Sequence, residues 1–230
     1  MMNSTQNMEE ESVLRWGGLA GVLGGLVLIV SGIVSVVIGP DFTQLEELIR
    51  FPAVRAARTV ENSLYLLALL LMASHFLALH HALRKSRPAP ALFGSGLGVI
   101  GLAVMAAGAL LHVSSVPLSD LYHAPDTTAE AQATLALIWQ ATWGVFEALL
   151  GAGLFAATIG VVGLGMAMLR APTMGRGVAW MSIVLGVIGI AGAFVFIIDP
   201  PSPIAAVGVL ALIVFHLAVG WKLYRLSRSA

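Results

Sequence analysis

Residues 134–169 read TLALIWQATWGVFEALLGAGLFAATIGVVGLGMAML, a long apolar run that contains one charged residue, Glu147. A continuous helix rises about 1.5 Å per residue, whereas the hydrocarbon core of a bilayer is only about 30 Å thick. This stretch therefore predicts a transmembrane helix that is too long for the bilayer. Such a helix either projects beyond one face of the membrane or breaks, and Gly144 is the expected position of a break.

The composition of the whole chain points to the same class of protein. Of its 230 residues, 58% are hydrophobic and 10% are charged, and the mean hydropathy is +0.93. Soluble domains are closer to half apolar and a quarter charged. The formal net charge is zero, so nothing indicates a nucleic-acid partner. The absence of cysteine excludes disulfides, thiolate metal sites and cysteine nucleophiles.

Six apolar runs each come near the roughly 20 residues that span a bilayer as a helix. The first follows an acidic lead and is too long for a cleavable signal, so we read it as a retained span. The chain is predicted to be all-α, a single domain over residues 1–230 that forms a bundle of six transmembrane helices after a short cytoplasmic tail, 1–15. The runs cover approximately residues 16–38, 64–83, 91–116, 134–169, 178–198 and 204–221.

Orientation follows from lysine and arginine, which stay on the cytoplasmic side of a membrane. With both termini inside, nine of the twelve basic residues fall on that side and only Arg50, Arg55 and Arg58 fall outside. We therefore expect a multi-pass protein of the cell membrane with a cytoplasmic N-terminus and a cytoplasmic C-terminus.

The two larger outer loops carry helix-start signals. Thr43 and Glu46 have capping-box spacing, and Pro52 would end or kink the helix that follows. We expect a short interfacial helix within residues 40–62, its arginines facing water or lipid headgroups. Thr127 and Glu130 repeat the capping box and predict a helix that starts near Thr128.

Two histidines are expected deep in the bilayer at matching heights. His75 and His216 each lie nine residues before an arginine that marks the cytoplasmic boundary, Arg84 and Arg225. Ionisable residues inside a span usually face the bundle interior and find a partner. The pair is open to three readings: neutral imidazoles hydrogen-bonded to a neighbouring helix, a proton relay, or the two axial ligands of a b-type haem.

A second group of polar residues is expected at the outer boundary. Gln140, Trp143 and Glu147 share one helical face, and His112 and Asp199 reach a similar height on neighbouring spans, as does Asn62. One reading is an interfacial aromatic belt with a solvated carboxylate. The other is an outward-facing pocket for a cation, a metal or a polar ligand. Two carboxylates and an imidazole suit zinc or another divalent ion, but no spaced ligand motif identifies the metal.

Small residues recur at helix-packing spacing: G-V-L-G at 21–24, and G-V-I-G at 98–101 and 186–189. In lipid, such residues let helix backbones approach closely. This predicts tightly packed spans.

The overall layout resembles a family of uncharacterised six-span prokaryotic membrane proteins classed as domains of unknown function. The resemblance lies in a basic residue before a Gly-rich first span, an outer helix, a Leu-rich second span ending in HHALRKSRPAP at 80–90, and a Gly-rich third span. It implies a six-helix membrane fold and brings no catalytic residues.

No serine nucleophile elbow, phosphate-binding loop or dinucleotide fingerprint occurs in the sequence, which does not favour an enzyme. The first functional hypothesis is a non-enzymatic membrane protein that binds a small ligand, a cation or a protein partner through its outer face. The alternatives are an electron-transfer protein that holds haem b through His75 and His216, and a structural subunit of a larger membrane complex. No cofactor is predicted outside the haem alternative, and the oligomeric state is undetermined.

Overall fold

The computed structural model describes residues 4–38, 44–199, 202 and 204–228. Within these ranges the regular structure is entirely helical. The helices are α1 (Ser4–Ile38), α2 (Gln44–Leu83), α3 (Pro88–Leu110), α4 (His112–Tyr122), α5 (Ala129–Met168), α6 (Arg176–Ile198) and α7 (Ala205–Leu226).

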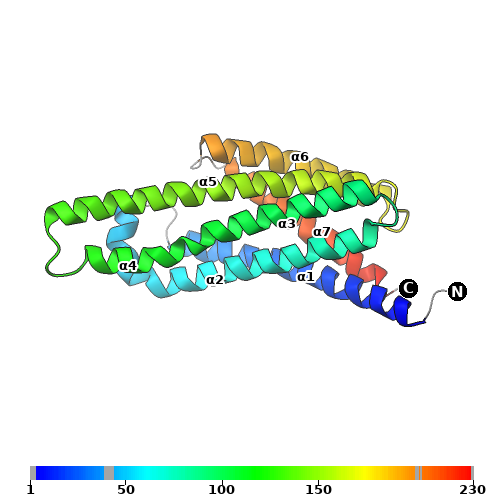
Figure 1. Ribbon diagram of the computed structural model, residues 1–230, viewed down its shortest axis with the longest axis horizontal. Helices are drawn as coiled ribbons and strands as arrows, with labels where there is room; N and C mark the ends of the chain where they lie inside the picture. Colours follow the sequence, from blue (N-terminus) through cyan, green and yellow to red (C-terminus); the bar gives the residue numbers. More distant parts are fainter. Residues whose placement is uncertain (1–3, 39–43, 200–201, 203, 229–230) are drawn as a thin grey trace.

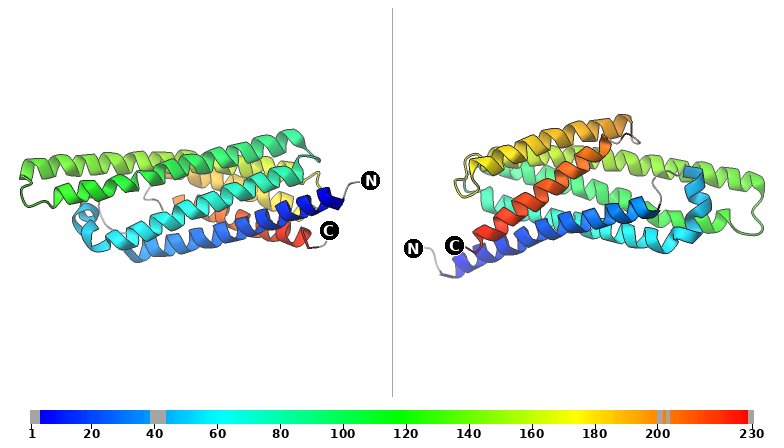
Figure 2. Two further views of the ribbon diagram at one scale, coloured as in Figure 1. Left: turned by 60° about the horizontal axis from the view of Figure 1, so that its bottom comes forward. Right: turned by 180° about the vertical axis from the view of Figure 1, so that it is seen from behind.

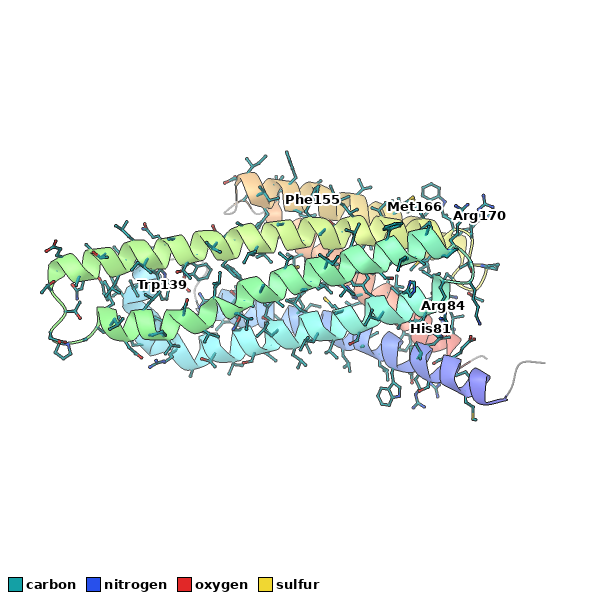
Figure 3. All side chains as sticks on the ribbon, in the orientation of Figure 1. His81, Arg84, Trp139, Phe155, Met166 and Arg170 are labelled. Carbon is teal, nitrogen blue, oxygen red and sulfur yellow. The ribbon has the colours of Figure 1, made fainter. Side chains whose placement is uncertain are left out.

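Six helices of the described chain are long and apolar enough to cross a membrane, which agrees with the six predicted spans. α3 and α4 together make one of them, because only Leu111 separates the two helices. The helices lie roughly side by side in one bundle, and α1 begins at the same end at which α7 finishes (Figure 1). We call this the proximal end and the opposite one the distal end. Both Arg84 and Arg170 lie at the proximal end, whereas Trp139 lies toward the distal end (Figure 3).

The quoted stretch forms one unbroken helix. α5 runs through Gly144 for 40 residues, or about 60 Å, so the projecting alternative is the one adopted. The helix begins near Thr128 as expected, but the predicted capping box is not the one used. Thr128 is the N-cap, and its hydroxyl accepts a hydrogen bond from the Ala131 amide at 3.2 Å, whereas the Thr127 hydroxyl donates to the Leu121 carbonyl. α4 and the start of α5 extend beyond the distal ends of α6 and α7 (Figures 1 and 2).

The prediction of a separate interfacial helix is not supported. Residues 44–62 form the first part of α2, which continues without a break into the second span. α2 nevertheless changes direction: its first turns run across the bundle and the rest runs along it (Figure 2). Pro52 lies inside the helix, and an interior proline is a common cause of a sharp kink, so Pro52 accounts for a bend rather than an end. Thr43, half of the predicted capping box, lies outside the described residues.

The start of α2, α4 and the start of α5 pack together at the distal end, and we call this assembly the distal cap. Its centre is a small apolar cluster of Leu48, Phe51 and Trp139, all buried. The rings of Phe51 and Trp139 meet edge to face at 5.5 Å. The imidazole of His123 on the α4 side lies 3.1 Å from the carbonyl oxygen of Ile49, which ties α4 to the bent part of α2.

Glycines bring α3 and α5 into backbone contact. A Cβ atom added at Gly153 would lie 2.5 Å from the carbonyl oxygen of Gly101, and one added at Gly160 would lie 2.5 Å from that of Gly94. No side chain larger than hydrogen fits between such backbones, as expected for small-residue packing in lipid. The predicted tight packing of the Gly-rich spans is therefore present on this pair of helices.

Candidate functional site

A pocket of about 670 Å³ lies in the distal half of the bundle, between α1, α2, α5 and α7. Its walls are mostly apolar. They comprise Leu28, Ile29, Gly32, Ile33, Val36 and Val37 of α1, Tyr65 of α2, Trp143, Phe146 and Leu150 of α5, and Ala206, Val209, Leu210 and Ile213 of α7, together with the polar Ser31, Ser35, Arg58, Glu61 and Asn62. This volume lies within the range of small-molecule sites, about 300–1,000 Å³.

The pocket exists because α1 and α7 touch at one end and diverge at the other. Near the proximal end their backbones are in contact: a Cβ atom at Gly18 would lie 2.8 Å from the carbonyl oxygen of Gly220, and one at Gly220 would lie 2.8 Å from that of Gly18. Toward the distal end the two helices separate (Figure 2). Residues from both diverging segments line the pocket, with α2 and α5 forming the other walls.

A nearly buried cluster of charges stands on the α2 wall. The Arg58 guanidinium donates to the carboxylate of Glu47 at 2.7 Å and to that of Glu61 at 2.7 Å. The three side chains are 10%, 12% and 17% exposed. Glu47 precedes the bend of α2 and Arg58 follows it, so this pair also holds the bend. The cluster carries one positive and two negative formal charges, a net of −1.

Two polar groups beside the pocket are unsatisfied in the described part of the protein. Burial covers both the Arg58 Nε–H and the Tyr65 hydroxyl, and neither has a hydrogen-bond partner there. A hydrogen bond of 3.1 Å runs from the Ser31 hydroxyl to the main-chain carbonyl of Glu61 and ties α1 to α2. An unpaired buried polar group costs about 1–3 kcal/mol, so a hydrogen-bonding ligand atom would be favourable at the Arg58 Nε–H and at the Tyr65 hydroxyl.

The structure brings together only part of the outer group expected from the sequence. Trp143 and Asn62 line the pocket, whereas Glu147 and Gln140 lie on the same helix as Trp143 but outside the lining. Glu147 is half-buried, and both Gln140 and Asp199 are exposed. Hydrogen bonds or ion pairs joining Glu147, Gln140 and Asp199 are absent from the described contacts. The side chain of His112 lies outside what the structure describes.

Sequence reasoning missed the centre of the site. Arg58 was expected to face water or lipid headgroups, which is wrong: its side chain is 10% exposed and paired with two carboxylates. A signal was present in the spacing of Arg58 and Glu61, which places them one helical turn apart. The partner on the other side, Glu47, lies eleven residues before Arg58, which is about three full turns and so the same helical face. A straight helix would hold the two residues about 16 Å apart, so periodicity alone does not reveal the contact that the bend creates.

The deep histidines meet. His75 and His216 are fully buried, and their ring centroids lie 5.1 Å apart. The His75 Nδ1 atom lies 2.9 Å from the carbonyl oxygen of Gly17 on α1; because a carbonyl only accepts, this nitrogen carries the proton and donates. Neither nitrogen of His216, nor Nε2 of His75, has a partner among the described residues.

The surroundings of the pair do not fit a haem. Two imidazoles on opposite faces of one metal, each bonded at about 2.0 Å, would hold their centroids roughly 6 Å apart with the macrocycle between them. Instead, the rings are closer and in edge-to-face contact, and Phe76 packs on His216 with a centroid distance of 4.9 Å. Phe76 and Phe215 stack on each other beside the histidines, filling the space that a macrocycle would need.

Within the described ranges, no group of three or more histidine, aspartate or glutamate side chains is arranged to hold a metal ion. The zinc or divalent-ion reading of Glu147, His112 and Asp199 therefore has no assembled ligand set in the described residues, and it stays a prediction.

Comparison with known proteins finds no matching protein family, no matching curated protein and no matching solved structure. The resemblance in layout to six-span proteins of unknown function is thus not tied to a particular family, and functional inference has to start from the pocket itself.

Proposed function

We propose that this multi-pass membrane protein binds an amphipathic small molecule in the pocket between α1 and α7, with an apolar tail among the aliphatic side chains and an uncharged, oxygen-bearing headgroup on the α2 wall. The observation that supports this most is a largely apolar pocket beside two buried polar groups, the Arg58 Nε–H and the Tyr65 hydroxyl, neither of which has a hydrogen-bond partner in the part of the chain that the structure describes. A few convergent polar groups in an apolar pocket are typical of small-molecule sites.

The charge of the cluster selects the headgroup. Glu47 and Glu61 already pair with the guanidinium of Arg58, and the net formal charge of −1 opposes a phosphate or carboxylate headgroup. The remaining Nε–H is a donor without an acceptor among the described residues, and the Tyr65 hydroxyl can donate or accept. An alcohol, ester or ketone oxygen can pair with either group, and it avoids the desolvation of a full charge.

Entry is proposed from the lipid phase. The α1 and α7 walls carry apolar side chains that are exposed on the outside of the bundle, including Ile33, Val36 and Leu210. An apolar rim suits a molecule that is already dissolved in the bilayer, and it gives a charged water-soluble molecule no favourable contact.

The proposed orientation follows from the distribution of lysine and arginine along the chain. The nine basic residues assigned to the cytoplasm lie in the parts of the helices and the loops that meet at the proximal end, so the proximal end is proposed to face the cytoplasm and the distal cap to face outside. The pocket then opens into the outer half of the bilayer of the cell membrane.

Tryptophan quenching by a brominated lipid tests the proposal. A variant that keeps Trp143 and the buried Trp139 as its only tryptophans, so that the distal cap stays intact, would be titrated in nanodiscs with a brominated long-chain alcohol and separately with the matching brominated fatty acid. We expect saturable quenching by the alcohol and at least severalfold weaker quenching by the carboxylate.

Two glycines offer a matched pair for the same experiment. A Cβ atom at Gly32 meets nothing within 4 Å and would point into the pocket region, and one at Gly96 also meets nothing but lies outside the pocket. Gly32→Leu should abolish the saturable phase and Gly96→Leu should leave it unchanged. Equal quenching in both variants would mean that the alcohol only contacts the surface, and the proposal would be wrong.

A further inference from the structure

A second pocket lies at the proximal end and has a different character. Its volume is about 290 Å³, and it is enclosed by the start of α1, the end of α2, the loop between α5 and α6, and the end of α7. Polar groups on its wall come from Glu10, His81, Lys85 and Thr173. Apolar side chains complete it: Leu14, Ala82, Met174, Leu223 and Leu226.

The polar side of this proximal pocket holds a displaceable cation. The Lys85 ammonium forms an ion pair with the carboxylate of Glu10. Lys85 is 62% exposed, so it can turn toward another anion without a large loss of burial. A surface pair of this kind contributes about 0–1 kcal/mol, which makes Glu10 a weak competitor for the ammonium.

Two imidazole nitrogens at this end lack a hydrogen-bond partner in the described part of the chain. The Nε2 atom of His81 is buried and has no hydrogen-bond partner among the described residues, and the same holds for Nδ1 of His80. Arg84, the residue before Lys85, adds a second cation at this end, where Figure 3 shows it beside His81. The formal charge of Glu10, Arg84 and Lys85 together is +1, the opposite sign to the cluster at the distal pocket.

The apolar wall decides the kind of anion. Leu223 is fully buried, and Leu14 and Leu226 are partly buried and pack against the main core of the bundle. These side chains give a soluble phosphate nothing to contact, whereas they can cover the first methylene groups of a lipid chain. Basic pockets between transmembrane helices at the membrane boundary suit anionic headgroups.

We propose that the proximal pocket binds the phosphate of an anionic phospholipid, with the exposed Lys85 ammonium donating to the phosphate oxygens and with the start of the acyl chains against Leu14 and Leu226. This inference does not depend on the ligand of the distal pocket, since the two sites share no lining residue.

The test is a titration of the purified protein in a neutral detergent with phosphatidylglycerol or phosphatidylcholine, with bound lipid counted by native mass spectrometry. Phosphatidylglycerol should bind at one saturable site, at least about tenfold more tightly than phosphatidylcholine. Lys85→Gln should weaken its binding by about tenfold, because it removes a charge-assisted hydrogen bond. Arg176→Gln, which removes a cation at the same end but outside the pocket, should change it by less than about twofold.

The Glu10→Gln variant gives the most discriminating comparison in this experiment. Both Glu10→Gln and Lys85→Gln break the same ion pair, so any effect of losing that pair on folding would be shared. The proposal requires opposite changes: Glu10→Gln should bind phosphatidylglycerol severalfold more tightly than the parent, because the competing carboxylate is gone.

Any of three results would overturn the proposal. Equal weakening of phosphatidylglycerol binding by Lys85→Gln and Arg176→Gln would indicate a response to overall charge, and a change of affinity in the same direction in Glu10→Gln and Lys85→Gln would contradict the competition. Displacement of the lipid by glycerol phosphate at a comparable concentration would identify a soluble phosphate as the ligand.

Discussion

Replacing Gly153 by alanine should separate α3 from α5, and its cost can be worked from the backbone contact. The added methyl group would lie 2.5 Å from the Gly101 carbonyl oxygen and 2.9 Å from the Met105 nitrogen, both main-chain atoms that no rotamer change can move. Ordinary van der Waals contact needs about 3.5–4.0 Å, so the helices must shift by roughly 1 Å. Overpacking of this kind costs about 1–3 kcal/mol, here at the upper end because both neighbours are backbone.

Alanine also favours the helix over glycine by about 1 kcal/mol, which leaves a net loss near 2 kcal/mol for Gly153→Ala. Gly144, on the same helix, is the control: a Cβ atom there meets nothing within 4 Å. Gly144→Ala should therefore keep the full gain of about 1 kcal/mol. The same chemical change at two positions of α5 should thus differ by about 3 kcal/mol in the free energy of unfolding.

Reversible unfolding by SDS in mixed micelles, followed by tryptophan fluorescence, measures this difference. Gly101→Ala should behave like Gly153→Ala, and Gly96→Ala should behave like Gly144→Ala, because a Cβ atom at Gly96 also meets nothing. The double variant of Gly101 and Gly153 should lose less than the sum of the single losses, since one methyl group already parts the helices. If alanine at Gly153 and at Gly144 shifts stability equally, the close approach of α3 and α5 is refuted.

Four further predictions follow from the charges and the histidines. Reporter fusions after Ala230 and in the 84–87 loop should both report the cytoplasm, and an outside signal from either would reverse the assigned orientation. Arg58→Met should destabilise the protein by about 3 kcal/mol by leaving two nearly buried carboxylates unpaired, and a loss below about 1 kcal/mol in the same SDS assay would mean that the pair is solvated. Protein purified from haem-replete cells should lack a Soret band, whereas a band lost in both His75→Ala and His216→Ala would restore the haem alternative. Glu147→Gln should change stability by no more than about 0.5 kcal/mol, and a divalent-cation-dependent gain in melting temperature that Glu147→Ala abolishes would instead support a metal site.

The six spans were predictable because apolar length alone decides which segments cross a bilayer. The start of α5 was predictable to within one residue: the capping box read from Thr127 and Glu130 placed the helix start near Thr128, and Thr128 itself is the cap. The depth argument for His75 and His216 needed only the rise of a helix and the position of the basic residues, and the two rings do lie in contact at 5.1 Å. Each of these inferences uses information confined to one helix or to the membrane boundary.

The pocket was not predictable in the same way. Its volume depends on the angle at which α1 and α7 cross, which is set by contacts between Gly18 and Gly220, more than two hundred positions apart in sequence. Its polar wall depends on the bend at Pro52, which turns Glu47 back toward Arg58. A proline in a sequence is compatible with an end or with a bend, and only packing in the distal cap, around Phe51 and Trp139, decides between them.

Because α1 and α7 cross, a rotation of one helix against the other about the crossing displaces both of its ends. The last close contact of the two helices is near Gly25, whose added Cβ atom would lie 2.8 Å from the Leu217 side chain, and the rim of the distal pocket is reached at Val36. Eleven residues separate Gly25 from Val36, an arm of about 16 Å, so a rotation of roughly 10° at the crossing moves the rim by about 3 Å. On the other side of the crossing, Leu14 of α1 and Leu223 of α7 form walls of the proximal pocket. Since Leu14 also lies eleven residues from Gly25, a displacement of α1 at the proximal pocket corresponds to a displacement of similar size at the rim of the distal pocket.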